Sequence, residues 1–379
     1  MSAAIAKQLV HAVRASEQRL VGLSHRIHGH PELAFEEVRA SEWVADALAE
    51  SGYETERRCF DLPTAVRATL GTGPVHVAIC AEYDALPAIG HACGHNIIAA
   101  AAVGAAAALA PFVDDLGLRI TVLGTPAEES GGGKVLMLER GAFAGLDAAM
   151  MVHPAPVETS RLAGLAVTQF KVQYQGKAAH AGASPELGLN AADAMTVAQV
   201  AVGLLRQQTT VTDRIQGIVS VAGSAPNIIP DESRGHWVVR SRDYDAVMAL
   251  RDRVEQCFKG AAMATGCELT LQSVGNDYAN LRSDPELEQL WCTAAAALGR
   301  NLRDASKDVV QGMATDMGNV SQVVPTIHPM LGLDCAPAMN HQPEFAAACV
   351  SMAANRAVLD GATAMAHTAV AFAASRLGS

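Results

Sequence analysis

The chain has 379 residues, of which 50% are hydrophobic and 18% charged, so it can bury a large core and is not a disordered chain. It carries 28 basic and 39 acidic residues, a net charge of −11, and no basic run, which argues against a nucleic-acid or anionic-membrane partner. At roughly 100–200 residues per domain, this length suggests two domains, or one domain with a large insertion.

The first twenty residues are typical of an amphipathic helix and lack the apolar stretch and cleavage site of a signal peptide. An alanine-rich apolar run at 97–113 follows the polar segment HACGHN, which favours a buried helix over a membrane span. The eight cysteines are dispersed and form no CxxC pair, which is typical of reduced thiols. We therefore expect a cytoplasmic protein.

Three short apolar runs are predicted to be strands buried on both faces, at Val75–Cys80, Arg119–Leu123 and Ala148–Val152. Helices predicted from about Asn96 to Ala110 and over Lys134–Arg140 lie between them, which indicates an α/β sheet. Each strand runs directly into a polar segment, namely AEYDALPAIGHACGHN, GTPAEESGGG and HPAP. Since ligand sites in open α/β sheets form beyond the carboxyl ends of strands, we expect these segments to meet.

The pattern changes near Leu165, where strands begin to alternate polar and apolar residues. The predicted elements, in the order β-α-β-β-α-β of a ferredoxin-like unit, are 166–176, Asn190–Arg206, 215–223, 233–243, Asp245–Ala264 and 267–275. Ser283 and Glu286, at capping-box spacing, predict that a new helix starts after this unit. We therefore expect a three-layer α/β domain of residues 1–165 and 281–379, with an inserted α+β domain of residues 166–280.

The strand ends carry side chains that suit a metal ion. Cys93 and His95 flank Gly94, which permits the turn that both need in order to reach one ion, and thiolate and imidazole are good zinc ligands. Glu128 and Glu129 diverge on an extended backbone, so one can bind a metal while the other faces a water. The alternatives are a buried cysteine beside a chance histidine, and a solvated acidic turn.

Convergence favours the metal site over these separate alternatives. Asp84 and His153 also lie just past strands, so three strand ends offer side chains for one metal centre. The segment AEESGGGK resembles a phosphate-binding loop, but Glu128 stands at the position of the first glycine, and Val135 follows Lys134 where serine or threonine is needed. The sequence therefore predicts a metal centre and no nucleotide site.

Three longer segments, AEYDALPAIGHACGHN, TPAEESGGGK and TDMGNVSQVVPTIHP, resemble the co-catalytic metallopeptidase and amidohydrolase family of carboxypeptidase G, aminoacylase, and hippurate and auxin-conjugate hydrolases. The branch that the chain resembles most is that of the B-type subunit of aminobenzoyl-glutamate hydrolase. HPELAFEE and GSAPNIIPDESRGHWVVR extend the resemblance over nearly the whole chain. The resemblance implies a metal-binding catalytic domain and an inserted domain that acts in dimerisation.

The resemblance implies five metal ligands, which are Cys93, His95, Glu129, His153 and His341. It implies that Glu128 is the general base and that Asp84 supports a ligand or the base from behind. His180 matches a histidine of the insert that reaches an active site, and Asn227 and Arg240 match insert residues that meet the substrate's carboxylate. Glu82 stands where carboxypeptidase G has a metal-binding histidine, so that ligand is not carried over.

Five ligands are too many for one tetrahedral ion with an open position, and they suit two divalent ions. Zinc or manganese is the first expectation, and cobalt or nickel is also acceptable. We expect cleavage of the amide bond of N-acyl or N-aroyl amino acids, or of dipeptides, by a metal-activated water with Glu128 as the base. The alternatives are a dipeptidase or carboxypeptidase-type peptidase, a metal-independent amidase that uses Cys93 as nucleophile, and a non-catalytic partner subunit.

The expected assembly is a homodimer through the inserted domain, and the resemblance implies that His180 serves the partner chain's metal site. The alternatives are that His180 is a surface residue or that it acts within its own chain. Strand 166–175 would pair edge to edge with its twin, and the apolar face of helix Asn190–Arg206 would add to the contact. A second kind of subunit is a further option, because the aminobenzoyl-glutamate branch includes paired subunits.

Overall fold

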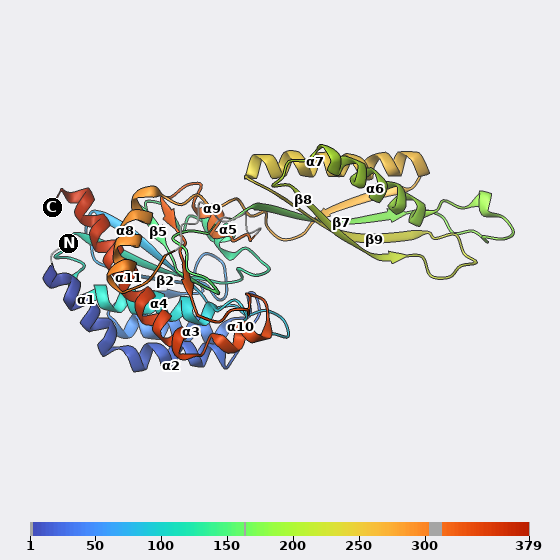
Figure 1. The fold of residues 1–379 in the computed structure, drawn as a ribbon. Helices are drawn as coiled ribbons and strands as arrows, with labels where there is room; N and C mark the ends of the chain where they lie inside the picture. The colour runs from blue at the N-terminus through green and yellow to red at the C-terminus, as the bar shows by residue number, and fades with distance from the viewer. Residues whose placement is uncertain (1–2, 163, 303–312, 379) are drawn as a thin grey trace. The chain divides into compact units, whose positions relative to one another are not determined.

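The computed structural model describes residues 3–162, 164–302 and 313–378 (Figure 1). The chain divides into two compact units. The first comprises Met1–Ala163, Leu281–Gln311 and Thr315–Ser379, and the second comprises Gly164–Asn280 and Gly312–Ala314. The main boundaries lie within two residues of the predicted ones, and the short return at 312–314 was not expected.

The first unit contains a six-stranded sheet in the order β1-β2-β4-β3-β5-β11 and a two-stranded sheet of β12 and β6. The strands are β1 (Glu54–Arg57), β2 (Val66–Leu70), β3 (Val75–Glu82), β4 (Leu118–Thr125), β5 (Ala148–Met150), β6 (His153–Ala155), β11 (Thr326–Ile327) and β12 (Met330–Gly332). The helices are α1 (Ala3–Ala15), α2 (Glu17–His28), α3 (Val38–Glu50), α4 (His95–Leu109), α5 (Gly133–Glu139), α8 (Pro285–Ala297), α9 (Met317–Val320), α10 (Pro343–Ala348) and α11 (Met352–Leu377). Because β4, β3, β5 and β11 are parallel, their carboxyl ends meet at one edge of the sheet, as predicted.

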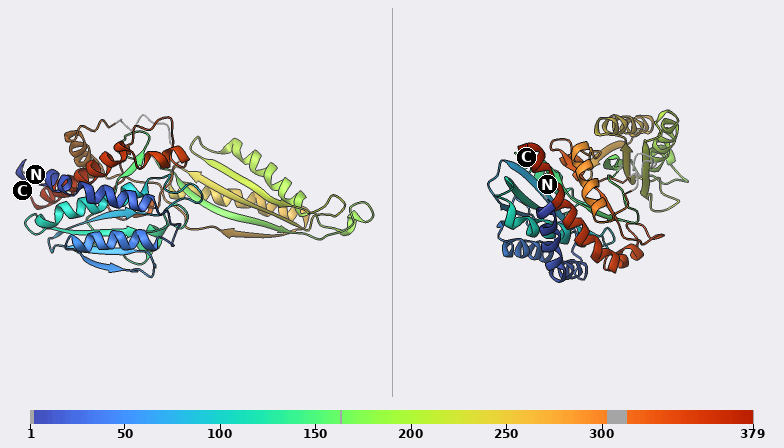
Figure 2. Two further views of the ribbon diagram at one scale, coloured as in Figure 1. Left: turned by 90° about the horizontal axis from the view of Figure 1, so that it is seen from below. Right: turned by 60° about the vertical axis from the view of Figure 1, so that its left-hand side comes forward.

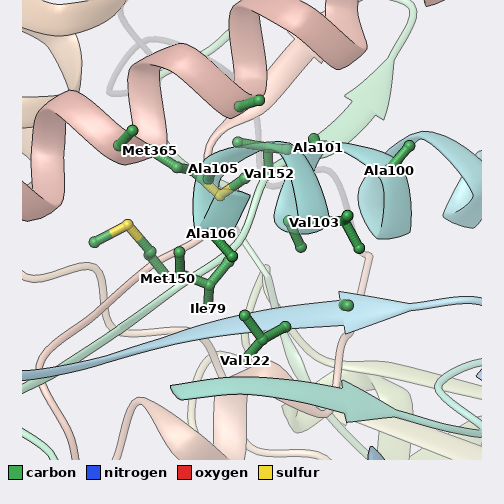
Figure 3. Packing of buried hydrophobic residues seen from close by; sticks show 14 of the residues in the cluster. Ile79, Ala100, Ala101, Val103, Ala105, Ala106, Val122, Met150, Val152 and Met365 are labelled. Carbon is green, nitrogen blue, oxygen red and sulfur yellow. The ribbon is translucent and has the colours of Figure 1, made fainter. Parts of the chain in front are cut away.

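Helices cover both faces of the large sheet, which confirms the three-layer α/β prediction. On one face, Ile79 of β3 and Val122 of β4 pack against α4, and Met365 of α11 lies on the far side of α4 (Figure 3). On the other face, Cys80 of β3 packs in a cluster with Met137 of α5 and Met317 of α9. A helix laid on each face buries the continuous apolar strands that the sequence predicted.

Helix α4 fits between the sheet and its neighbouring helices because its side chains are small. A Cβ atom at Gly104 would lie 2.8 Å from Ala362 Cβ of α11 and 2.8 Å from Leu20 Cδ1 of α2, so these helices approach closely only with glycine there.

By length and composition, His95–Phe112 and Met352–Leu377 could each cross a membrane, but 78% of each window is buried inside the structure. Core helices of a folded domain meet the same description. α1 and α11 lie side by side in both views of Figure 2. A hydrogen bond joins them, because His367 Nε2 donates to the Ala6 carbonyl at 3.1 Å.

The second unit is a four-stranded antiparallel sheet in the order β10-β7-β9-β8, with α6 and α7 on one face (Figure 1). Its elements are β7 (Ala166–Gln175), α6 (Ala191–Leu205), β8 (Arg214–Ala222), β9 (Glu232–Ser241), α7 (Tyr244–Thr265) and β10 (Glu268–Ser273). The ferredoxin-like prediction is confirmed. The prediction that strand 166–175 is an outer strand is wrong, because β7 pairs with β10 on one side and β9 on the other.

Three local predictions also need correction. The first twenty residues form parts of two helices, because α1 ends at Ala15 and α2 begins at Glu17. The third predicted strand stops at Met150, and His153 begins β6, which belongs to the smaller sheet. Helix α8 is capped by Asp284, whose carboxylate accepts the Leu287 N–H at 2.9 Å, and not by Ser283.

The correction at α8 gives a paired stability test. Asp284→Ala is expected to lower the free energy of unfolding by about 1 kcal/mol, because the cap hydrogen bond to an otherwise unpaired helix N–H is lost. Ser283→Ala is the matched control and should change it little, because the buried Ser283 hydroxyl makes no hydrogen bond to the described residues. Urea unfolding with a common slope measures both; a larger loss at Ser283 would restore the capping-box interpretation.

Candidate metal centre

Asp84 orients the first histidine of the site. It lies two residues past the end of β3, where its Oδ1 accepts a hydrogen bond from His95 Nδ1 at 2.9 Å. A carboxylate can only accept, so the proton of a neutral His95 sits on Nδ1, and its Nε2 lone pair faces the site. Asp84 Oδ2 accepts the Glu129 N–H at 2.9 Å, so the same carboxylate also fixes the loop that follows β4.

Gly94 allows Cys93 and His95 to face one point, as predicted. Its φ is +77°, in the left-handed region, and a Cβ there would lie 2.3 Å from Pro154 Cγ. Cys93 Sγ lies 3.5 Å from His153 Nε2, while His153 Nδ1 donates to the Pro154 carbonyl at 2.8 Å. His153 therefore also turns its Nε2 lone pair toward the site.

The two glutamates leave the end of β4 through a turn that Glu37 holds. Ala127 has a φ of +58°, and its N–H donates to Glu37 Oε1 at 2.8 Å, while Thr64 donates to Glu37 Oε2 at 2.7 Å. The Ala127 turn places Glu128 Oε2 and Glu129 Oε1 each 4.0 Å from His95 Nε2. Glu37 belongs to the HPELAFEE segment, so this segment supports the site from behind.

His341 reaches the same centre from a distant loop. Its N–H donates to the Ala92 carbonyl at 2.8 Å, which ties this loop to the Cys93 segment, and its Nε2 lies 3.4 Å from Glu129 Oε2. The His341 side chain is 56% exposed, whereas the side chains of His95 and Glu129 are 0% and 7% exposed. The predicted convergence of separate segments is therefore observed for all five ligand candidates, Glu128 and Asp84.

These side chains form three overlapping groups that could each hold a metal ion, with ligand atoms within 4.8 Å of one another. The groups are Cys93–His95–His153, Cys93–Glu129–His341 and His95–Glu128–Glu129. Cys93 belongs to the first two groups and can therefore bridge two positions, with two further ligands on each side. Glu128 joins only the third group and neither of those that contain Cys93.

The unpaired atoms of the site fit a divalent cation. His95 Nε2, Glu129 Oε1 and Glu82 Oε2 are buried and make no hydrogen bond to any described residue. Burial opposes a charge on His95, but Asp84 and Glu82 raise its pKa well above the ordinary value. Burial, and then Glu129, raises the pKa of the Cys93 thiol well above its usual value. A bound cation would supply the positive charge that these carboxylates and the thiol lack.

The surroundings of Cys93 do not favour the cysteine-amidase alternative. A nucleophilic cysteine needs its thiolate form, which neighbouring cations or histidinium groups favour. Around Cys93, the burial and the Glu129 carboxylate favour the protonated thiol. Cys93 is thus suited to a role in which a metal ion draws off its proton, and poorly suited to act alone.

His180 and Asn227 lie together in the second unit. His180 Nδ1 accepts the N–H groups of Gly182 at 3.2 Å and Ala183 at 3.1 Å, so a neutral His180 carries its proton on Nε2, and its side chain is exposed. The Asn227 carbonyl accepts the Ala181 N–H at 2.9 Å. The exposed Nε2–H is a donor of the kind that stabilises an oxyanion.

Arg240 lies at the other end of the same sheet. It pairs with Val167 at the start of β7, whereas the His180 loop follows the end of β7 at Gln175. Eight residue steps of a strand separate these ends by roughly 25 Å. Within one chain, the structure therefore does not bring Arg240 together with His180 and Asn227.

Four further residues support the site and were given no role from the sequence. His328 stacks on His153 with 5.3 Å between ring centroids, and neither of its buried ring nitrogens makes a hydrogen bond to the described residues. Lys134 forms ion pairs with Asp316 and Glu82 beneath the centre. Glu37 accepts the Ala127 N–H and so holds the turn that precedes Glu128. All four lie inside the quoted motifs, so the motifs were the available signal, but burial and pairing are not visible in a sequence.

A family model described as "Peptidase family M20/M25/M40" matches residues 78–365. This chain belongs to that family. The M20 chain is 40% identical to the Xaa-Arg dipeptidase of Mus musculus over 93% of its own length and 85% of the relative's. It is 32% identical to the B-type subunit of the p-aminobenzoyl-glutamate hydrolase of Escherichia coli, over 67% of this chain and 57% of the relative.

The solved structures agree on the fold. A dinuclear metal-binding M20 peptidase from Bacillus subtilis superposes with a TM-score of 0.74 and 22% identity, over 95% of this chain and 99% of that one. An aminobenzoyl-glutamate utilization protein from Klebsiella pneumoniae superposes with a TM-score of 0.75 and 21% sequence identity, over 96% of this chain and 98% of that one. Members of the M20 family are metal-dependent hydrolases of amide or peptide bonds, and so is this chain.

Proposed function

We propose that this M20 chain hydrolyses the amide bond of dipeptides or of N-acyl or N-aroyl amino acids with two divalent metal ions. The observation that carries the proposal is the shared ligand Cys93, with His95 and His153 on one side and Glu129 and His341 on the other. Two ions roughly 3.5–4 Å apart can polarise a carbonyl and make a water nucleophilic near neutral pH. Zinc or manganese suits this mixed thiolate, imidazole and carboxylate set first, with cobalt and nickel as alternatives.

The residues of the chain divide the remaining work. Glu128 accepts the proton of the attacking water and returns it to the leaving nitrogen. The buried position of Glu128, together with Glu82 and Glu129, raises its pKa well above the usual carboxyl value, which favours the protonated form that passes a proton to the leaving nitrogen. His180 Nε2–H donates to the developing oxyanion, and the Arg240 guanidinium offers a fork for the substrate's carboxylate.

Dipeptides that end in arginine are the first substrates to test. The dipeptidase of Mus musculus aligns over 93% of this chain, and the net charge of −11 favours the approach of a cationic substrate. Aminobenzoyl-glutamate is the second candidate, because the Escherichia coli hydrolase is also similar. Acyl-amino acids complete the panel.

The test is hydrolysis of this panel by metal-free protein reconstituted separately with zinc, manganese, cobalt or nickel. The proposal expects ninhydrin-detected release of free amino acid with at least one metal. No release from any substrate by protein loaded with two ions would contradict it. Activity from this chain alone would also rule out the non-catalytic partner role and the need for a second kind of subunit.

We further propose a homodimer in which the second unit of each chain serves the metal centre of its partner. One substrate carboxylate cannot meet Arg240 and Asn227 of the same chain across roughly 25 Å, whereas two chains can supply one residue each. The edge strand β8 and helix α6 offer the contact, with Ile218 64%, Val200 59% and Leu204 68% exposed. In this proposal β8 pairs edge to edge with its twin across the dimer, the role that the sequence analysis had given to β7.

Subunit mixing tests this assignment. Glu128→Ala and His180→Ala chains, each inactive alone, are combined and exchanged. One site of each heterodimer then has an intact Glu128 and receives an intact His180, so up to half of the wild-type activity per heterodimer is expected. Mass-tagged chains verify the exchange, and confirmed heterodimers without activity would exclude action across the dimer.

We also infer a reducing compartment such as the cytoplasm. All eight cysteines are free thiols, and Cys93 needs its thiol to serve as a ligand.

A further inference from the structure

One lysine and two acidic side chains form a fully buried ion cluster beneath the metal centre. Lys134 Nζ lies 2.5 Å from Glu82 Oε1 and 2.5 Å from Asp316 Oδ1, and all three residues are 0% exposed. The Lys134 N–H also donates to Asp316 Oδ2 at 2.8 Å. The cluster joins the end of β3, the first turn of α5 and the residue that precedes α9.

Such a cluster is costly, so its position is informative. Removing charges from water costs several kcal/mol per ion, and apolar residues of similar volume often stabilise a fold equally well. Two carboxylates around one ammonium leave one negative charge. The Lys134 ammonium lies within ion-pair distance of one oxygen of Glu82 and one oxygen of Asp316, so the geometry is that of a cation shared by two carboxylates.

The second oxygen of Glu82 faces the metal centre. Glu82 Oε2 lies 3.5 Å from His95 Nε2 and makes no hydrogen bond to the described residues. Two ligands on one tetrahedral ion lie roughly 3.3 Å apart when each is about 2.0–2.1 Å from the ion. Glu82 is therefore close enough to His95 to reach the ion that His95 would bind.

Glu82 nevertheless belongs to none of the three ligand groups. It approaches His95 but not the Cys93–His95–His153 set as a whole, and its other oxygen is held by Lys134. The geometry is that of a carboxylate kept beside a metal position and outside the ligand set.

We propose that Lys134 is a positioning residue which, with Asp316, holds Glu82 beside His95 as an uncoordinated counter-charge. Glu82 then adds negative charge near the ion, while the coordination position that it could occupy stays open for water and substrate. The inference rests on the dinuclear centre proposed above. Freed from Lys134, Glu82 would turn its carboxylate onto the ion and close that position.

The test uses cobalt(II)-loaded full-length protein, because the visible absorption of cobalt(II) weakens as its coordination number rises from four. Lys134→Met/Asp316→Asn removes one positive and one negative charge, so the buried charge stays at −1 while Glu82 loses its tether. The double variant is expected to show weaker cobalt absorption, tighter metal binding and loss of turnover. Adding Glu82→Gln to give the triple variant should return the absorption toward that of the wild type.

Glu82→Gln alone is the matched control and keeps the Lys134–Asp316 pair. It should retain two ions and the wild-type cobalt spectrum, with metal affinity lower by roughly 10–100-fold, which is typical when a group outside the ligand set is removed. A changed spectrum or a lost ion in Glu82→Gln would make Glu82 a ligand and overturn the proposal. An unchanged spectrum in the double variant, or no reversal in the triple variant, would overturn it as well.

The wild-type protein separates this inference from the proposed function. If it binds no metal, the dinuclear proposal fails. If it binds two ions and is active while the Glu82→Gln spectrum differs, only the role of Lys134 and Glu82 fails. The Glu82→Gln measurement keeps the inference testable even if the double variant does not fold.

Discussion

Glu128→Gln is expected to lower kcat by roughly 10²–10⁴-fold while the fold and the metal content stay unchanged. Glutamine keeps the size of the side chain but cannot take a proton from water near neutral pH. Glu128 Oε2 lies 4.0 Å from His95 Nε2, close enough to face a water at the centre, and its side chain is 10% exposed. The measurement is kcat and KM on the best substrate of the panel, with elemental analysis of the same samples.

Glu129→Gln is the matched neighbour and should instead lower metal occupancy. Glu129 Oε2 lies 3.4 Å from His341 Nε2, and Glu129 belongs to a ligand group with Cys93, which Glu128 does not. If the two variants had equal metal content, the division of roles between the two glutamates would be wrong.

Cys93→Ala is expected to reduce the bound ions from two to one or none and to remove activity. Among the residues that the structure describes, the two proposed ion positions share the Cys93 thiol alone, so both lose a donor in one substitution. Chelation should likewise abolish wild-type activity, and added metal should restore it. Elemental analysis before and after chelation checks both outcomes.

Cys349→Ala is the control for a lost buried thiol. Cys349 Sγ lies 3.1 Å from the position of a Cβ at Gly94, yet Cys349 belongs to none of the ligand groups. This variant should keep two ions and most of the activity. Activity that survives chelation in the wild type but vanishes in Cys93→Ala would instead support a cysteine amidase.

The convergence at the sheet edge could be predicted because it follows from topology. Parallel strands end at one edge, and Asp84, Glu128 and His153 each lie two or three residues past the end of one of three such strands. The turn at Gly94 was also predictable, since a glycine between two potential ligands permits the backbone that both need. The distant His341 was assigned only through the family resemblance.

Other features depend on pairing, which alternation of residues does not reveal. The alternation of polar and apolar residues in β7 indicates which face of the strand is packed by helices. A central strand and an edge strand show the same alternation, so it does not indicate the position of the strand in the sheet. The placement of β7 between β9 and β10 comes from the connections. Lys134 follows a glycine-rich run that is typical of exposed loops, and its burial depends on Asp316, 182 residues away.

The two ion positions that share Cys93 differ in their access to water. His95 is completely buried and His153 nearly so, whereas His341 is 56% exposed on a loop. The exposed His341 could move away from a bound ion by a local loop movement, whereas His95 begins α4, which is packed in the core and would hold its ligand atom in place. If two ions bind as proposed, we expect the ion beside His341 to exchange faster than the ion beside His95, so a low metal supply would empty the His341 position first.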